Sequence, residues 1–395
     1  MSSASTTTTA PPPPPDPGPA PRLQSKLARF WRRVTEGLEL QQLWSQFRAD
    51  ARASYRLYSR DIQPAPADEG RLHRFFHTAQ QFAWAILEKL SPPRRVLLLL
   101  AVILLLLPSG GIRYRGENGE IVAGEFDFKF YGGLLMFVVL ILEVSDRVVM
   151  KRDLEIARDI QRWLLPSSPP QIPGLTIAFA TRPANTVAGD YYDVFARPAA
   201  LPGETRYLLA VADVAGKSIP AALLMATFQA SLKTLSSTAA SLEELVAAMN
   251  RYACSNSQGG LRFTTAFLAE FEPSSRTLTY INAGHNAPAL RRSSGQIERL
   301  TAGGLPLGIQ PEAPYQSDRV VLQNEDWLIV FTDGLIEAVN RQDEEYGELR
   351  MLNVLQAGAG VAPDRLLSRL MIDVDTFVGE TPQHDDITCL LVKVG

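Results

Sequence analysis

Acidic side chains stand at the ends of apolar stretches in four places of this sequence. The stretch "WLIVF" is typical of a buried strand, and the turn "TDG" follows it; "YLLAVA" leads to an acid in the same way. The segments "VAGDYYDVF" and "HDDITCLLVKV" place acids directly before apolar runs. The acids at these four places are Asp190, Asp213, Asp333 and the neighbours Asp385 and Asp386.

Carboxylates in this pattern indicate cation chemistry. One aspartate in a turn is ordinary, because Asp hydrogen-bonds to nearby backbone groups. Several carboxylates that converge at strand ends repel one another unless positive charge lies among them. Oxygen ligands without a matching His and Cys cluster suit Mg²⁺ or Mn²⁺ and do not suit zinc. We therefore expect a divalent-cation site, with Gly189, Gly216 and Gly334 allowing the backbone to approach the ions.

Length and composition leave room for such a site in a larger protein. The 395 residues allow two or three domains, and a hydrophobic content of 46% allows buried cores. The net charge of -3 and the pI near 5.9 argue against nucleic-acid binding by the chain as a whole. Two distant cysteines, Cys254 and Cys389, give no disulfide framework; both are interpreted as structural, and they favour a reducing compartment.

The N-terminal part changes character twice. Residues 1–22 are rich in Ser, Thr and Pro and are expected to form a disordered tail. Residues 23–90 contain apolar residues at helical spacing with many basic residues between them, which predicts an amphipathic helical region. Such helices lie on an anionic membrane surface or pack on protein, and the sequence leaves both possibilities open.

Two apolar runs, 96–107 and 130–144, fall within residues 92–145. They predict a pair of transmembrane helices, with a short extracytoplasmic β-hairpin around residues 117–119; buried core helices are the alternative. Basic residues on the outer flanks of both runs place the two termini in the cytoplasm. The sequence therefore predicts a protein of the cytoplasmic membrane whose catalytic domain lies in the cytoplasm.

Residues 146–165 predict a helical connector to the last domain. They carry an apolar seam at spacings of three and four residues: Met150, Leu154, Ala157, Ile160 and Leu164. The helix is expected to stop at Pro166, where "PSSPPQIPG" marks the start of a domain over residues 166–395. The seam either pairs with a second copy as a homodimer or packs on the following domain.

Six ordered segments carry a resemblance to a known family. They are "ARDIQRWLLPSSPPQIPGLTIAFATRPANTVAGDYYDVF", "ADVAGKSIPAALLMA", "YINAGHNAPAL", "GGLPLGI", "VFTDGLIEAVN" and "HDDIT". Together they resemble the metal-dependent protein serine/threonine phosphatases (the PPM, or type 2C-like, family). The SpoIIE-like bacterial branch, whose phosphatases regulate sigma factors, is the most similar. The resemblance covers about residues 157–395 and does not extend to residues 1–150.

The resemblance implies an α+β fold for the last domain, a four-layer α-β-β-α sandwich of two antiparallel sheets. It also implies two Mn²⁺ or Mg²⁺ ions at one end of the sandwich. Asp213 is expected to bridge both ions and, with Asp333, to be central to catalysis. Asp385 is favoured over Asp386 because the family's ligand stands three residues before a Thr, here Thr388. The implied ligand set is Asp190, Asp213, the Val214 carbonyl, Asp333 and Asp385.

The implied activity is that of a membrane-anchored phosphoserine/phosphothreonine protein phosphatase in bacterial signalling. Water activated by two metals would attack phosphorus. Its partner would be a phosphorylated protein, by analogy an anti-sigma-factor antagonist. Two alternatives remain: a degenerate phosphatase-like scaffold that binds a regulator, and a metallohydrolase of small phosphate esters.

Further candidates lie close to the acids in sequence. Lys217 and Arg182 are candidates for phosphate binding, and His384 is a candidate general acid for the leaving group. His285 in "NAGHNAP" is interpreted as a histidine that fixes its turn by hydrogen bonding.

Two positions depart from the family pattern. Ala188 and Ser218 stand where the family usually has glycine. Neither change removes a ligand, but both alter the loops around the expected metal centre. We therefore expect an active enzyme whose activity depends on the conformation of these loops.

Overall fold

The computed structural model describes residues 80–81, 84, 87–108, 110–115, 121–198, 205–257, 262–358 and 360–395. The chain divides into two compact units, Met1–Val144 and Ser145–Gly395. The predicted tail, residues 1–22, and most of the predicted amphipathic region, 23–90, lie outside the described residues.

The first unit contains a helix, a hairpin and the beginning of a long helix. Helix α4 (Pro92–Leu106) begins with two prolines, which suit a first turn because its N–H groups have no partner within the helix. Strands β1 (Gly110–Arg115) and β2 (Ile121–Phe126) pair antiparallel, as the sequence predicts. Helix α5 (Phe128–Leu164) then runs for 37 residues, so the second apolar run and the predicted connector form one continuous helix.

Close contact of the backbones joins α4 to the first part of α5. A Cβ on Gly132 would lie 2.9 Å from the Leu105 side chain and 3.0 Å from the Ala101 carbonyl oxygen, so glycine permits this approach. An ion pair of 3.3 Å joins Arg94 to Glu143. Apolar packing and one ion pair thus hold the two helices together.

The prediction of two membrane-spanning helices across residues 92–145 requires correction. Among the described residues, no helix combines the length and the apolar character that crossing a membrane requires. Helix α4 has 15 residues, fewer than the ~20 that a span needs. In α5, the charged residues Lys129 and Glu143 limit the apolar stretch on both sides.

Two β-sheets form the centre of the second unit. The strand order of the first sheet is β10–β7–β6–β5–β4, with β11 also paired to β7. Its strands are β4 (Tyr191–Pro198), β5 (Thr205–Val214), β6 (Thr264–Glu272), β7 (Thr277–Ala283), β10 (Gly303–Gly304) and β11 (Asp318–Val321). The order of the second sheet is β3–β13–β12–β8–β9. Its strands are β3 (Leu175–Arg182), β8 (Ala289–Arg291), β9 (Ile297–Arg299), β12 (Trp327–Phe331) and β13 (Ile387–Val394).

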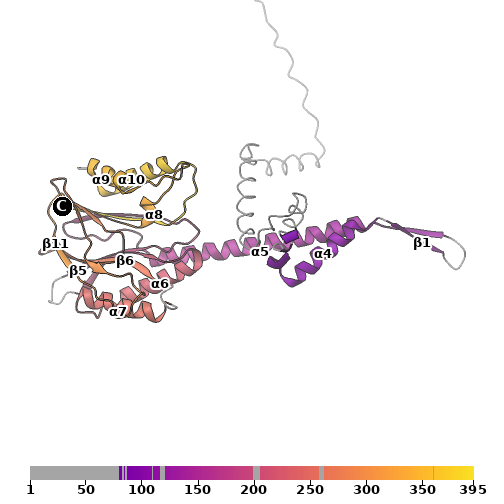
Figure 1. The fold of residues 1–395 in the computed structure, drawn as a ribbon, viewed down its shortest axis with the longest axis horizontal. Coiled ribbons are helices and arrows are strands. Elements are labelled where there is room, and N and C mark those ends of the chain that lie inside the picture. The colour runs from indigo at the N-terminus through magenta and orange to yellow at the C-terminus, as the bar shows by residue number, and fades with distance from the viewer. Residues whose placement is uncertain are drawn as a thin grey trace, which may run out of the picture. The chain divides into compact units, whose positions relative to one another are not determined.

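Helices cover the outer face of each sheet (Figure 1). Helices α6 (Ser218–Leu235) and α7 (Leu242–Ser255) pack on the first sheet, and α9 (Glu348–Ala357) and α10 (Pro363–Val378) on the second. This arrangement confirms the expected four-layer α-β-β-α sandwich. One detail differs: the short strand β10 runs parallel to β7, whereas the other described pairs are antiparallel.

Side chains alternate between the two faces of each strand. One face packs against the other sheet and the opposite face against helices, and the same alternation directs polar residues inward at one end of the sandwich. In β5, Leu208 and Ala210 face α6 and α7, while Leu209 and Val211 face the other sheet. The next residue on the inward face is Asp213. By the same period of two, three other strands direct polar residues into this end of the sandwich: Asp190 before β4, Thr332 after β12, and Asp386 and Thr388 at the start of β13.

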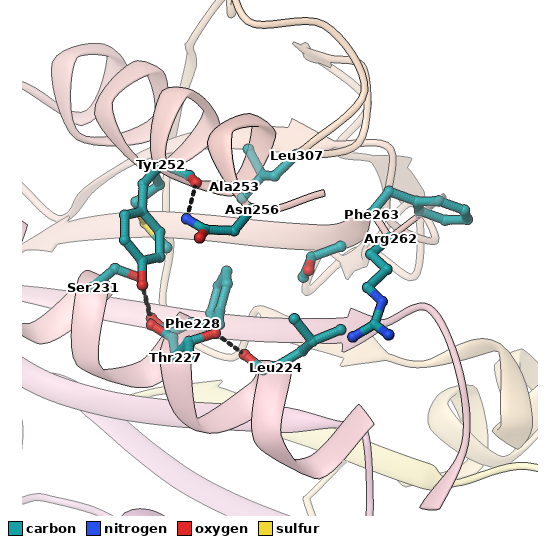
Figure 2. A pocket seen from close by; sticks show the side chains of 12 residues that line it. Leu224, Thr227, Phe228, Ser231, Tyr252, Ala253, Asn256, Arg262, Phe263 and Leu307 are labelled. Atoms are coloured by element: carbon teal, nitrogen blue, oxygen red, sulfur yellow. Dashed lines mark hydrogen bonds between the residues drawn. The ribbon is translucent and has the colours of Figure 1, made fainter. Parts of the chain in front are cut away.

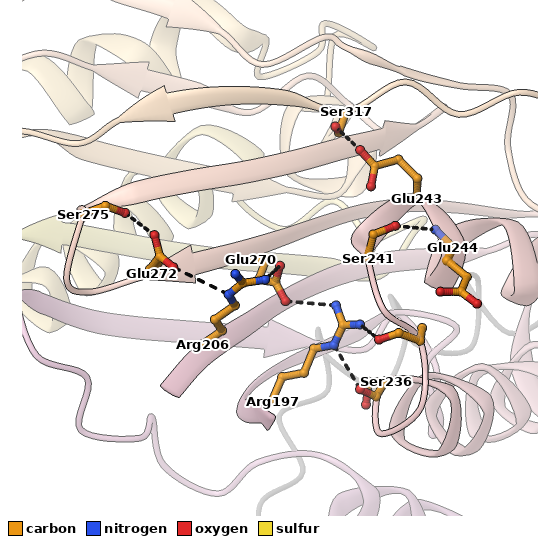
Figure 3. Close-up of polar contacts among 11 residues, drawn as sticks. Arg197, Arg206, Ser236, Ser241, Glu243, Glu244, Glu270, Glu272, Ser275 and Ser317 are labelled. Atoms are coloured by element: carbon orange, nitrogen blue, oxygen red, sulfur yellow. Dashed lines mark hydrogen bonds and ion pairs between the residues drawn. The ribbon is translucent and has the colours of Figure 1, made fainter. Parts of the chain in front are cut away.

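Buried ion pairs hold the opposite end of the first sheet (Figure 3). The Arg197 side chain lies 2.9 Å from Glu270, and its Nε donates to the Ser236 carbonyl at 3.0 Å. Arg206 approaches the same glutamate at 3.4 Å. Because Ser236 follows α6, these contacts tie the C-terminal end of that helix to the sheet, while its N-terminal end begins beside Asp213.

Candidate active site

A buried hydroxyl joins the two sheets at the acidic end of the sandwich. The Thr332 side chain donates to Asp190 at 2.9 Å and accepts the backbone N–H of Thr388, also at 2.9 Å. Thr332 is fully buried, so these two bonds satisfy a group that water does not reach. Asp190, which belongs to the first sheet, is therefore fixed by two strand ends of the second sheet.

The carboxylates at this end repel one another. Burial and the Asp213 carboxylate raise the pKa of Asp190 well above its ordinary value. Burial and the nearby carboxylates, Asp333 first, raise the pKa of Asp213 to about 7. Burial and Asp385 also raise the pKa of Asp333. The negative charge of the carboxylates at this end of the sandwich is therefore not fully compensated by neighbouring positive groups.

Asp385 and Asp386 have different surroundings. Both oxygens of Asp386 accept backbone N–H groups, from Ala184 at 2.7 Å and from Gly189 at 2.6 Å. Asp385 is half-exposed, and one of its oxygens lies 3.0 Å from the Lys217 ammonium. Asp386 thus fixes the loop before Asp190, whereas Asp385 faces a half-exposed cationic side chain and solvent.

The glycine after Asp333 is required by close packing. Asp333 begins a short helix, α8 (Asp333–Ile336), so the expected sharp turn is a helix start. A Cβ on Gly334 would lie 2.1 Å from the Asp386 carbonyl oxygen. The sequence analysis expected Gly334 to let the backbone approach the ions, whereas the structure shows that it lets the backbone approach the chain before β13.

The loop between β5 and α6 has an unusual backbone. Gly216 has φ +122° and Ser218 has φ +61°, and Lys217 lies between them. The left-handed region costs a residue other than glycine about 1–2 kcal/mol. The departure of Ser218 from the family's glycine therefore leaves a strained position beside Asp213.

Several predicted residues line one hollow of about 230 Å³ beside these acids. The hollow is lined by the two side chains predicted to bind phosphate, Lys217 and Arg182, and by the predicted general acid, His384. Asp385 and Glu337 also line it. The Arg182 guanidinium pairs with Asp375 on α10. Sequence analysis did not single out Glu337, although it lies four residues after Asp333 in the same motif.

His285 has a structural environment. Its Nδ1 is 2.9 Å from the Thr265 hydroxyl, and its backbone N–H donates to Asn282 at 2.7 Å. Burial lowers its pKa to about 4, so the ring is neutral at physiological pH. These contacts agree with a histidine that fixes its turn. Burial also raises the pKa of the Cys389 thiol to about 12, which makes it a poor nucleophile.

Gln161 near the end of α5 is a positioning residue that sequence analysis missed. Its buried amide donates to the Ala188 carbonyl at 2.7 Å and accepts the Ala188 N–H at 3.0 Å. Ala188 is two residues before Asp190. The last turns of α5 are therefore bonded directly to the loop that carries the first acid.

A second hollow lies between α6 and α7 (Figure 2). Its lining is largely apolar and includes Leu224, Phe228 and Leu307, with Arg262 and Tyr252 beside them. It contains no carboxylate. None of the predicted acids therefore lines this second hollow.

The donor chemistry at the acidic end suits divalent cations. All candidate ligands are oxygens, and the raised pKa values of Asp190, Asp213 and Asp333 indicate negative charge that a cation would offset. In the described part of the chain, however, no three or more His, Cys, Asp and Glu side chains are gathered closely enough to hold a metal ion. The donors fit a metal centre by type, while their side chains do not form a finished coordination shell.

Comparisons with known proteins identify the family of this domain. The sequence model of the family "Stage II sporulation protein E (SpoIIE)" matches residues 203–395. "Phosphoserine phosphatase RsbU" of Bacillus subtilis is 31% identical over 246 residues, which cover 62% of this chain and 70% of RsbU.

The chain belongs to the SpoIIE family. It carries a serine/threonine phosphatase domain of the type 2C-like class. "Protein IcfG" of Synechocystis is 27% identical over 277 residues, covering 63% of this chain and 42% of IcfG, so the chain spans less than half of that relative. The SiaA-PP2C domain of Pseudomonas aeruginosa has the same fold: its TM-score is 0.55 at 20% identity, covering 64% of this chain and 99% of that domain.

Replacing Asp213 with Asn should stabilise the metal-free SpoIIE-family protein. A folded-state pKa of about 7 lies above the ordinary value of 3.8, so ionised Asp213 costs stability above about pH 4. We expect the free energy of unfolding of Asp213→Asn to exceed wild type by roughly 1–2 kcal/mol at pH 8 and to match it at pH 4. Urea unfolding in EDTA measures this difference.

The control is Asp343→Asn, which changes an aspartate in an exposed turn. It should alter the free energy of unfolding neither at pH 4 nor at pH 8. A lower stability of Asp213→Asn at pH 8 would contradict the repulsion described above.

Proposed function

We propose that residues 166–395 hydrolyse phosphoserine or phosphothreonine on a protein, with two Mn²⁺ or Mg²⁺ ions as cofactors. The observation that supports this proposal is that Asp333 and Asp385 lie close enough to Asp213 for their charges to raise its pKa, and that Asp385 lines a hollow together with Lys217 and Arg182. Membership of a family that includes named phosphoserine phosphatases supports the reaction class.

Each residue has a proposed role. Asp190, Asp213, Asp333 and Asp385, with the Val214 carbonyl, hold the cations. When bound, a pair of divalent cations lowers the pKa of water and offsets charge on the phosphoryl group. Lys217 and Arg182 attract the phosphate dianion into the hollow. His384, which is exposed at its rim, donates a proton to the departing serine or threonine oxygen.

The test measures phosphate release by the full chain with Mn²⁺, from a phosphoserine protein and from p-nitrophenyl phosphate. We expect metal-dependent release with preference for the protein. Preference for the small ester would favour a small-phosphoester hydrolase. Mn²⁺ binding without release would favour a phosphatase-like scaffold.

The partner proposed here is a phosphorylated anti-sigma-factor antagonist. The relationship to the phosphoserine phosphatases RsbU and RsbP of Bacillus subtilis motivates this substrate class. A location at the cytoplasmic membrane stays a prediction from the flanking basic residues, and cell fractionation tests it.

Variants at Asp385 and Asp386 separate the ligand from its neighbour. Both Asp386 oxygens accept backbone N–H groups, whereas one oxygen of Asp385 contacts only the half-exposed Lys217 ammonium among the contacts described above, so we propose Asp385 as the ligand. We expect Asp385→Asn to lower kcat/KM about 100-fold or more, with weaker Mn²⁺ binding. Asp386→Asn keeps one acceptor oxygen, so it should lower stability by about 1–2 kcal/mol and kcat/KM by less than about tenfold. The opposite ranking would make Asp386 the ligand.

Helix α5 is proposed to control the site through Gln161. Replacing Gln161 with Leu leaves the Ala188 backbone groups without partners, so the loop before Asp190 loses two bonds. We expect kcat to fall about tenfold or more, because small displacements of catalytic groups are costly. The exposed neighbour variant Arg162→Leu should retain wild-type turnover. Equal turnover in both variants would remove α5 from the control of the site.

A homodimer through residues 146–165 is a separate proposal. Met150 and Ile160 of the predicted seam are 61% and 48% exposed, so they offer apolar surface to a second copy. We expect wild type to sediment as a dimer and Ile160→Asp as a monomer. A wild-type monomer in sedimentation equilibrium at micromolar concentration would contradict the dimer.

A further inference from the structure

Lys217 connects the two sheets at the acidic end. It belongs to the loop between β5 and α6 of the first sheet, and its contacts are on the segment before β13 of the second. The ammonium group donates to the His384 carbonyl at 2.7 Å and lies 3.0 Å from a carboxylate oxygen of Asp385. The Lys217 side chain thus places a positive charge beside Asp385, a half-exposed carboxylate of the site.

Lys217 contacts one carboxylate oxygen of Asp385, while a backbone N–H contacts the other. The other oxygen of Asp385 accepts the Asp386 N–H at 2.9 Å, so the ammonium occupies the remaining oxygen. Within the described residues, Lys217 therefore takes part of the role that a bound cation would have.

The ion pair between Lys217 and Asp385 is weak enough for another cation to replace the lysine. Both Lys217 and Asp385 are about half-exposed, with side chains at 56% and 46%, and such ion pairs are weak in water. Gly216 and Ser218, on either side of the lysine, both have positive φ. An ammonium and a divalent cation on one carboxylate repel each other, so occupation by one disfavours the other.

We propose that Lys217 is an internal cation that occupies Asp385 in the metal-free protein and is released when a divalent cation binds there. The released ammonium stays in the hollow beside Arg182 and His384, where it binds the substrate's phosphate group. This inference rests on the proposed metal-dependent phosphatase function. It gives Lys217 two successive partners, a carboxylate and then a phosphate, so metal and substrate binding favour each other.

Mn²⁺ titration of the full chain by calorimetry tests the exchange. We compare wild type with Lys217→Met and Lys217→Gln, each checked for folding by circular dichroism. Arg182→Met is the matched control, because it removes a cation from the same hollow that pairs with Asp375 and with none of the proposed ligands.

Loss of the ammonium should tighten the weaker Mn²⁺ site about 2- to 5-fold, as expected for an exposed ion pair. Arg182→Met should change Mn²⁺ affinity by less than about twofold, because Arg182 pairs with Asp375 and with none of the proposed ligands. Inorganic phosphate should bind the Mn²⁺-saturated Lys217 variants about 3-fold more weakly than wild type, since one charge-assisted bond is lost.

Three results would overturn the exchange. One is unchanged or weaker Mn²⁺ binding in both folded Lys217 variants. Another is an equal tightening in Arg182→Met, which would indicate a general field effect. The third is unchanged phosphate affinity in the Lys217 variants. The proposed function is tested separately: wild type that binds no Mn²⁺ and releases no phosphate defeats both, whereas active wild type with unaltered Lys217 variants defeats the exchange alone.

Discussion

Repulsion among buried carboxylates is the interaction on which this end of the molecule depends. Asp190, Asp213 and Asp333 each have a raised pKa because burial and neighbouring acids disfavour their charged forms. A protein selected for stability alone would replace such groups. Binding of a cation among these acids would account for their position at the end of the sandwich. The negative charge that destabilises the protein without a cation also strengthens the binding of one.

The surrounding structure holds these acids together despite their repulsion. The Thr332 hydroxyl joins Asp190 to the second sheet, and the Asp386 carboxylate holds the backbone at Ala184 and Gly189. Gln161 binds the same loop from α5. In the proposed account, Lys217 offsets part of the charge until metal binds. In this account α5 acts on the loop before Asp190, and Lys217 acts on Asp385.

Part of this arrangement could be predicted from the sequence, because side chains alternate regularly between the two faces of a strand. The apolar runs before Asp213 and before Asp333 are buried strands. Counting by two places Asp213 on the inward face of its sheet, whereas the same count in β12 places Thr332, and not Asp333, on that face. The motifs likewise identified the four-layer fold. The roles of Thr332 and Gln161 were not accessible, because each depends on a partner far away in sequence: Asp190 lies 142 residues from Thr332. The two predicted spans failed because apolar runs were counted without the helix ends, which leave α4 with 15 residues.

The most direct test of the central claim is a crystal structure of the full chain grown with Mn²⁺, with anomalous scattering used to locate the metal. The account expects two anomalous peaks among the carboxylates of Asp190, Asp213, Asp333 and Asp385, with the Lys217 ammonium moved away from Asp385. The absence of metal between these side chains at saturating Mn²⁺ would contradict it, as would a metal bound by other residues.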